Sequence, residues 1–276
     1  MKKFLTLIII AICLLIGSCN SNNSSSLSLA PVKQKRLDLL NMNNKPNRNM
    51  LNVSLDTKKI GWGLGNIKDE LNRPTDSLDA NKKYNKYDAF FIDEKSKKIT
   101  LTFDQGYENG YTDKIINVLN DKNVQAIFFI TYEYVKDQPD LVKKMLDSGH
   151  IIGNHSYRHK SMPEISVAEQ ETEIMTLHDY MEDKFNYTMK LFRPPMGEFS
   201  EQSLATAKNV GYTSMFWSFA YLDYLVQQQP APDESLNKIV ENAHPGAIYL
   251  LHSVSKTNAD ILDKAIDKIR EKGFEI

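Results

Sequence analysis

Cysteine is almost missing from this chain. Its 276 residues include two, Cys13 and Cys19, and both lie within the first nineteen positions. The rest of the protein can therefore form no internal disulfide, and a hydrophobic core has to stabilise it. The chain also lacks an excess of either charge. It has 34 Lys and Arg against 35 Asp and Glu, without a basic stripe, which argues against a nucleic-acid partner.

The apolar stretch near the start, residues 4–16, is too short for a comfortable membrane span, and its flanks are those of an export signal. Lys2-Lys3 precede it, and the small residues Gly17-Ser18 follow it directly before Cys19. This ending resembles a bacterial lipobox, in which the cysteine is lipidated and becomes the mature N-terminus. We expect residues 1–18 to be a lipoprotein signal peptide, with an ordinary signal peptide or an uncleaved anchor as the alternative.

The next segment, residues 19–58, is rich in Asn, Ser and Lys and has little apolar periodicity. Such a composition predicts a flexible polar tether that holds a catalytic body off a membrane. From residue 59 onward the chain has the composition of a globular protein. The remaining roughly two hundred residues suffice for one sizeable domain.

Strand and helix patterns alternate along this second part. The expected strands are 98–103, 126–130, 151–152, 191–192, 214–217, 247–251 and 274–276, and the expected helices are 113–120, 139–148, 167–185, 203–209, 235–243 and 260–272. This alternation predicts an α/β fold with a parallel sheet, closed as a barrel. The candidate chemical residues follow directly after predicted strands, where barrel folds place their active sites.

Three of these candidates have the chemistry of metal ligands. His155 and His159 follow one predicted strand, and Asp104 ends another. Imidazole nitrogen and carboxylate oxygen suit zinc and its first-row neighbours. A third histidine, His252, leaves a spare proton donor, so the set suggests metal-assisted hydrolysis. Histidines four residues apart could instead be a pair on the surface of a helix.

The order of five short motifs produces a resemblance to a known family. They are Thr102-Phe-Asp-Gln-Gly106, His155-Ser-Tyr-Arg-His159, Arg193-Pro-Pro-Met-Gly197, Trp217 with Asp223-Tyr224, and Leu250-Leu-His252. In this order they resemble the polysaccharide deacetylase family, the NodB homology domain of carbohydrate esterase family 4. The resemblance implies a distorted (β/α) barrel, one catalytic domain over residues 59–276, and a hydrolase that cleaves the carbon–nitrogen bond of N-acetyl groups in polysaccharide or peptidoglycan.

By this resemblance, His155 and His159 would bind a divalent metal, zinc in the first place and otherwise magnesium, manganese or cobalt. The family uses a further aspartate as a ligand, and Gln105 stands at that position here. Because a glutamine amide is a neutral and poor ligand, we expect weaker or different metal binding, with water or Gln105 completing the site. The string 103–112 resembles the sporulation branch, the muramic-δ-lactam deacetylases, which tolerates a non-aspartate at this position.

The resemblance also implies the catalytic roles. Asp104 would be the general base that deprotonates the attacking water, and Arg193 would keep it ionised through a bidentate pair. His252 would be the general acid for the leaving amine, with Asp223 beside it to raise its pKa. Each also has a plainer interpretation: Asp104 could cap the next helix, Arg193-Pro-Pro could be a rigid strand exit, and Asp223 could be an ordinary loop carboxylate.

Four further residues would surround the substrate. The backbone N–H of Met196 would face the tetrahedral oxyanion, and Leu250 would line the pocket of the acetyl methyl group. Trp217 is expected in the barrel core or the groove wall. Tyr224, like Met196, replaces an aromatic residue that is commoner in the family.

Several other polar residues are expected to be structural. Glu108 and Asn109 follow the proposed base closely and could touch substrate or metal, although turn geometry explains them more simply. Three histidines have no motif around them and are interpreted as structural or solvated: His150, His178 and His244.

The resulting hypothesis is de-N-acetylation of N-acetylmuramic acid in peptidoglycan whose stem peptides have been removed, leading to muramic-δ-lactam as in spore cortex. The partners would be the glycan strand, the membrane through the lipid anchor, and an amidase that removes the stem peptides beforehand. The protein would sit on the outer face of the cell membrane or at the spore envelope. Two alternatives remain: a deacetylase of N-acetylglucosamine units or chitooligosaccharides, and a glycan-binding lipoprotein without turnover, which Gln105 alone favours.

Overall fold

The computed structural model describes residues 55–276. The predicted signal peptide, the predicted lipidation of Cys19 and most of the predicted tether fall on residues 1–54, outside the described residues. Within the described part, no helix combines the length and the apolar character that a membrane span requires.

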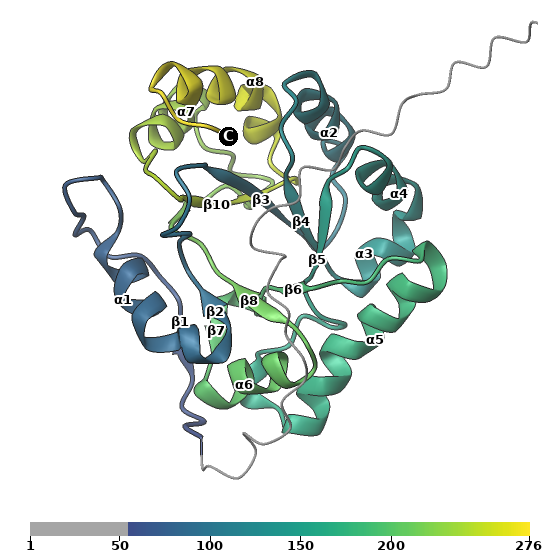
Figure 1. The fold of residues 1–276 in the computed structure, drawn as a ribbon. Coiled ribbons are helices and arrows are strands. Elements are labelled where there is room, and N and C mark those ends of the chain that lie inside the picture. The colour runs from purple at the N-terminus through teal and green to yellow at the C-terminus, as the bar shows by residue number, and fades with distance from the viewer. Residues whose placement is uncertain (1–54) are drawn as a thin grey trace, which may run out of the picture. The chain divides into compact units, whose positions relative to one another are not determined.

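A parallel sheet of eight strands forms the centre of the described residues. The strands follow the order β2-β8-β6-β5-β4-β3-β10-β9. The bounds are β2 Ala89–Phe90, β3 Thr100–Gln105, β4 Ile127–Ile130, β5 Ile151–Asn154, β6 Leu191–Phe192, β8 Thr213–Met215, β9 Phe219–Ala220 and β10 Ile248–His252. The sheet curls into an incompletely closed barrel with helices around its outside (Figure 1). The predicted distorted (β/α) barrel is confirmed.

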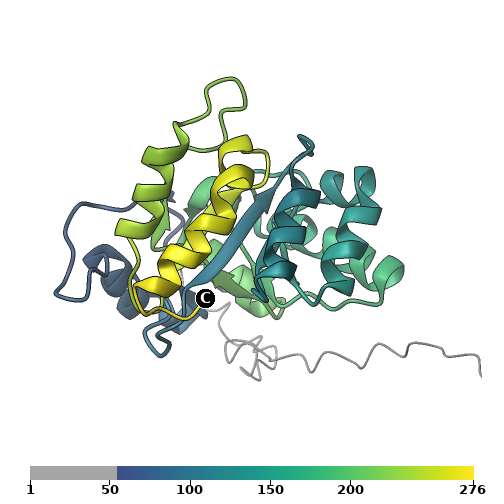
Figure 2. The same ribbon diagram turned by 90° about the horizontal axis from the view of Figure 1, so that it is seen from above.

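Eight α-helices surround this sheet in the described part of the chain, and α7 and α8 lie side by side (Figures 1 and 2). The bounds are α1 Thr75–Tyr84, α2 Thr112–Asp121, α3 Tyr132–Asp137, α4 Pro139–Asp147, α5 Val167–Phe185, α6 Glu201–Asn209, α7 Pro232–Glu241 and α8 Lys256–Glu271. Capping boxes fix where two of them begin, Ser166 with Glu169 at α5 and Ser200 with Ser203 at α6. A separate antiparallel pair joins β1 (Ile60–Gly61) to β7 (Glu198–Phe199).

One predicted strand is wrong. Residues 274–276 form no strand, because the chain there makes a single backbone hydrogen bond to the sheet region, from the Ile99 N–H to the Glu275 carbonyl at 2.8 Å. Two helices were not predicted. In α1 most residues are polar, so apolar periodicity is weak, and α3 has only six residues.

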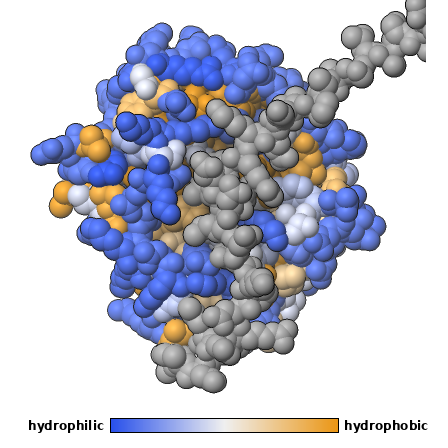
Figure 3. All heavy atoms as spheres, in the orientation of Figure 1, coloured by the Kyte–Doolittle hydropathy of each residue, from blue (hydrophilic) through white to orange (hydrophobic). Residues whose placement is uncertain are grey.

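Strand β4 shows how the sheet separates two hydrophobic clusters. Ile127 and Phe129 belong to one cluster, whereas Phe128 and Ile130 belong to the other, on the opposite face. Successive side chains of a strand alternate between faces, so a strand buried on both faces has to be apolar throughout. On the face seen in Figure 3, the described surface is mainly hydrophilic with smaller hydrophobic patches. The apolar side chains buried on both faces of the sheet form the hydrophobic core that stabilises this part of the protein without disulfides.

Two histidines without a motif are buried in this core. His150 and His244 are 3% and 1% exposed, and burial lowers the pKa of each to about 4. His150 Nδ1 accepts the Ala126 N–H at 3.3 Å, and His244 Nε2 bonds the Ser218 hydroxyl at 2.8 Å. Both rings are therefore neutral and structural rather than solvated.

Lowering the pH from 7 to 5 is expected to remove about 2 kcal/mol of unfolding free energy for each of these two histidines. The unfolded chain binds the proton near the ordinary pKa of 6.5, whereas the folded protein binds it only near 4. Stability present above pH 6.5 is thus lost as the pH falls. Urea unfolding of the wild type and His150→Phe at both pH values measures the effect. The variant should lose about 2 kcal/mol less, and equal losses in the two proteins would contradict the prediction.

Candidate active site

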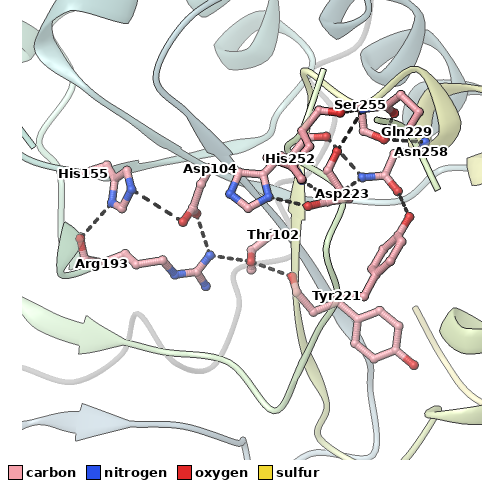
Figure 4. A network of polar contacts seen from close by, with 12 residues as sticks. Thr102, Asp104, His155, Arg193, Tyr221, Asp223, Gln229, His252, Ser255 and Asn258 are labelled. Atoms are coloured by element: carbon pink, nitrogen blue, oxygen red, sulfur yellow. Dashed lines mark hydrogen bonds and ion pairs between the residues drawn. The ribbon is translucent and has the colours of Figure 1, made fainter. Parts of the chain in front are cut away.

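The predicted site residues converge at the carboxyl ends of the central strands. Asp104 lies at the end of β3 and His252 at the end of β10, and the parallel register pairs these two residues directly. His155 follows β5 and Arg193 follows β6. Because the ends of parallel strands open on the same edge of a sheet, these residues meet although they are far apart in the sequence (Figure 4).

The two histidines of the second motif face each other across a loop, not along a helix, so the alternative of a helix-surface pair is wrong. Their Nε2 atoms are 3.1 Å apart. His155 Nδ1 lies 2.9 Å from the Arg193 carbonyl, which can only accept, so Nδ1 carries the hydrogen and Nε2 carries the lone pair. His159 has a positive φ of 56°, and its N–H donates to the Ser156 hydroxyl at 2.9 Å, which turns the ring back toward His155.

Both rings are neutral at pH 7. Burial lowers the pKa of His155 to about 4, despite the nearby charge of Asp104, and burial also lowers the pKa of His159. Two neutral imidazoles with converging Nε2 atoms are suited to hold a divalent metal.

Gln105, at the position of the family's further aspartate, is fully buried. Its Nε2 donates to the Ser253 hydroxyl at 2.6 Å, whereas its Oε1 has no hydrogen-bond partner among the described residues. Since side chains alternate along β3, Gln105 points to the face opposite that of Asp104.

The described residues supply part of a site for a divalent metal ion. The histidine pair supplies two converging nitrogen ligands. Within residues 55–276, however, no group of three or more His, Cys, Asp or Glu side chains is placed to hold a metal ion. Gln105 stands at the sequence position of the acidic third ligand, but its side chain is tied to the Ser253 hydroxyl on the face opposite Asp104.

Asp104 forms a buried ion pair with Arg193. The Arg193 Nη1 donates to Asp104 Oδ1 at 2.7 Å and to the Thr102 hydroxyl at 2.8 Å, and the guanidinium is fully buried. The predicted bidentate pair is wrong, because Nη2 and Nε donate instead to the carbonyls of Phe216 and Met215, each at 3.1 Å. Burial alone would raise the pKa of Asp104, but the charge and hydrogen bond of Arg193, together with the fields of His155 and His252, outweigh it and hold the pKa below its ordinary value. Asp104 is therefore a carboxylate at neutral pH.

His252 is held from behind by Asp223. Its Nδ1 lies 2.7 Å from Asp223 Oδ1, and its backbone N–H donates to Asp223 Oδ2 at 2.8 Å. Burial lowers the pKa of His252, but the hydrogen bond and charge of Asp223, together with the charge of Asp104, more than offset this, so the pKa is raised above its ordinary value. Asp223 itself is fully buried, which excludes the interpretation as an ordinary loop carboxylate.

The four residues expected around the substrate differ in exposure. Met196 and Tyr224 are about half exposed, at 52% and 51%, and the Tyr224 ring meets His252 edge-on with centroids 5.3 Å apart. Leu250 is buried two residues before His252 on β10. Trp217 is buried, with its carbonyl accepting the Trp62 Nε1–H at 3.0 Å, as expected of a core or wall residue.

The turn that follows Asp104 has a structural role. Glu108 accepts from the N–H groups of Gly110 and Tyr111, at 2.6 and 3.0 Å, and so secures the start of α2. Asn109 donates to the Val254 carbonyl at 2.9 Å. The simpler interpretation of both as turn residues agrees with these contacts.

Two residues of the site were missed by sequence reasoning. Asn258, in α8, donates to Asp223 Oδ2 at 2.6 Å, and the Tyr221 hydroxyl bonds Asn258 Oδ1. Neither belongs to a spaced motif of ligands or nucleophiles. Tyr221 lies in the segment of the fourth motif, which is the one signal that could have indicated it.

Known proteins resemble this chain in sequence and in fold. Residues 92–215 match a family model described as polysaccharide deacetylase. Peptidoglycan-N-acetylmuramic acid deacetylase PdaA of Bacillus subtilis (strain 168) is 40% identical over 228 residues, which cover 80% of this chain and 84% of that protein. A peptidoglycan-N-acetylglucosamine deacetylase of Bacillus cereus is 31% identical over 189 residues, covering 67% and 68%.

A solved structure shows the same architecture. The structure of Bacillus subtilis PdaA, described as a family 4 carbohydrate esterase, matches with a TM-score of 0.74 and 39% sequence identity. The match covers 79% of this chain and 94% of that one.

Proposed function

The chain belongs to the polysaccharide deacetylase family, and from this we propose that it removes the acetyl group from N-acetylmuramic acid in peptidoglycan. The enzymes of this family hydrolyse N-acetyl amide bonds. One observation carries the proposal: an ionised carboxylate, Asp104, and an imidazole with a raised pKa, His252, lie side by side on adjacent strands. The similarity to PdaA supports N-acetylmuramic acid as the sugar.

Asp104 is assigned as the general base. An amide carbonyl is a poor electrophile, so the attacking water has to lose its proton as it adds. Arg193 occupies Oδ1 of the carboxylate, whereas Oδ2 lies 3.5 Å from His155 Nε2, on the side of the histidine pair. Oδ2 is therefore the atom that we expect to accept the proton.

His252 is assigned as the general acid. Asp223 accepts the hydrogen bond from Nδ1, so Nε2 is the ring nitrogen that can face the amine of the leaving group. As the carbon–nitrogen bond of the tetrahedral intermediate breaks, the proton on Nε2 passes to that nitrogen, and the products are acetate and the free amine. The raised pKa keeps more of the imidazole protonated near neutral pH.

His155 and His159 are assigned as the protein ligands of a divalent metal, held through their Nε2 atoms. Zinc suits two imidazoles best, and magnesium, manganese or cobalt are the other candidates. When bound, the metal supplies polarisation of the amide carbonyl and a lower pKa for the attacking water. Gln105 contributes no charge, which supports a weaker site than one with three charged or imidazole ligands.

The remaining assignments concern the position of the sugar. The N–H of Met196 is proposed to meet the oxyanion, and Leu250 to line the pocket of the acetyl methyl group. The exposed Tyr224 ring, next to His252, is proposed to pack against the sugar, with Trp217 supporting the wall behind it.

The similarity to PdaA and the N-terminal sequence support a proposed cellular setting. We infer that the substrate is glycan whose stem peptides an amidase has removed, and that the free amine then closes to the muramic-δ-lactam of spore cortex. The signal-like start and Cys19 support export and a lipid anchor on the outer face of the membrane, or a place at the spore envelope.

Acetate release tests the function. Peptidoglycan with and without stem peptides, and N-acetylglucosamine oligosaccharides, are incubated with metal-loaded protein and with His155→Ala. We expect release from the stripped peptidoglycan alone, falling by about 10²-fold or more in the variant. The 31% identity to an N-acetylglucosamine deacetylase favours the first alternative, which release from the oligosaccharides would support. Gln105 favours the non-catalytic alternative, which glycan binding without any acetate release would support.

A further inference from the structure

A second layer of buried polar side chains lies behind the His252–Asp223 pair. Asn258, in the first turn of α8, donates from Nδ2 to Asp223 Oδ2 at 2.6 Å and to the His252 carbonyl at 3.2 Å. The Tyr221 hydroxyl bonds Asn258 Oδ1. Asp223 and Asn258 are 0% and 1% exposed. Figure 4 shows the four side chains linked in one line.

Chemistry fixes the direction of every hydrogen bond in this line. Asp223 Oδ2 and the His252 carbonyl can only accept, so the Asn258 group that faces them is its NH₂. The Asn258 carbonyl oxygen then faces Tyr221, whose hydroxyl has to donate. The line ends on one oxygen of Asp223, and the other oxygen remains for the Nδ1–H of His252.

Asn258 does not need its side chain to start the helix. The Ser255 hydroxyl caps α8 by accepting the backbone N–H of Asn258 at 3.1 Å, a bond that any residue other than proline could make. The side chain is turned to Asp223 instead. The buried amide therefore satisfies the Asp223 carboxylate, and the start of the helix does not depend on it.

Asn258 and Tyr221 also leave the charge of Asp223 unneutralised. Both are neutral donors, and within residues 55–276 the ion-pair partner of Asp223 is His252. The other titratable or charged groups whose fields act on His252 come from the neighbouring strand ends and the histidine loop: Asp104, Arg193 and His159.

We propose that Asn258 and Tyr221 are positioning residues for the general acid. Asn258 holds the Asp223 carboxylate so that His252 presents Nε2 to the leaving amine, and Tyr221 fixes the orientation of the Asn258 amide. The inference rests on the proposed role of His252.

Asn258→Leu tests the positioning through kinetics. We expect kcat to fall ten- to a hundredfold, on the order seen when an outer partner of a catalytic ligand is removed, with KM changed by less than about twofold. The matched control is Thr257→Val, in the same helical turn, which loses a bond to the Pro230 carbonyl and, within residues 55–276, forms no hydrogen bond with Asp223. Its kcat should stay near that of the wild type. If Asn258→Leu does not fold, Tyr221→Phe removes only a hydroxyl and should lower kcat in the same sense.

Asn258→Asp tests the role through the pKa of His252, which would not change if Asn258 only stabilised the fold. The new carboxyl lies next to Asp223, and once ionised it adds negative charge near His252, which should raise the pKa of the imidazole by about one unit. The alkaline limb of the pH profile of kcat should shift to higher pH by the same amount. An NMR titration of the His252 ring reads this shift without substrate.

These outcomes separate the positioning role of Asn258 and Tyr221 from the proposed deacetylase function. A kcat for Asn258→Leu equal to that of Thr257→Val, or an unchanged His252 titration in Asn258→Asp, overturns the positioning role. If the wild type releases no acetate but the titration shifts as expected, the positioning holds and the proposed function fails.

Discussion

Asp104→Asn is expected to lower kcat/KM for acetate release by about 10³-fold or more, because the neutral amide cannot take a proton from water. The substitution keeps the size of the side chain and an oxygen that can accept from Arg193 Nη1, so the site geometry should change little. The measurement is acetate release from stripped peptidoglycan across several substrate concentrations. An activity within about tenfold of the wild type would show that another group is the base.

The same substitution also affects stability, and the control has to separate the two effects. Removing the carboxylate leaves the buried guanidinium of Arg193 without its counter-charge, and breaking such a pair costs about 3–5 kcal/mol. The loss should lie at the low end, since Thr102 and two backbone carbonyls still accept from the guanidinium. Thermal unfolding identifies a temperature at which the variant is folded, and the assay is run there.

Thr102→Val is the matched control for Asp104→Asn. It removes another acceptor of the same Arg193 nitrogen and a bond to the Tyr249 carbonyl, while Asp104 remains. We expect about 1–3 kcal/mol of lost stability and less than tenfold loss of kcat/KM. If this control were as inactive as Asp104→Asn while folded, the loss in both would come from the misplaced arginine and not from the missing base.

The strand ends could be predicted because each one follows a short apolar run. The runs before Asp104, His155 and His252 need no tertiary information, and parallel alternation brings their ends to one edge. That residues 274–276 form no strand could not be predicted in the same way. Phe274-Glu-Ile276 has a strand-like pattern, yet one backbone bond to Ile99 does not make a ladder, because pairing depends on the neighbouring strand and not on the pattern alone.

The parts of the site that were missed or wrong depend on where side chains meet. The sequence indicates that Arg193 lies near Asp104, but the bidentate pair fails because the carbonyls of Met215 and Phe216 take two of its nitrogens. Asn258 contacts Asp223 although the two residues are 35 positions apart in the sequence. No periodicity encodes such a contact, since it arises where the first turn of α8 meets the loop that carries Asp223.

Gln105→Asp is expected to tighten zinc binding by about a hundredfold if the shorter side chain, released from Ser253, turns toward the histidine pair. A carboxylate at this position would add a negatively charged oxygen to the two imidazoles of His155 and His159, and the attraction to a divalent cation is strong in a buried site. The wild-type amide is instead tied to the Ser253 hydroxyl at 2.6 Å. Titration calorimetry of metal-free protein with zinc measures the change.

Gln105→Asn separates the effect of charge from the effect of length. It shortens the side chain as aspartate does and breaks the bond to Ser253, but it stays neutral, so zinc binding should remain near the wild-type level. Equal tightening in both variants would mean that the freed space, not the charge, limits the metal. No tightening in either would mean that the alternation of β3, which turns position 105 away from Asp104, keeps any side chain there from reaching the histidine pair. The metal would then depend on His155, His159 and water alone.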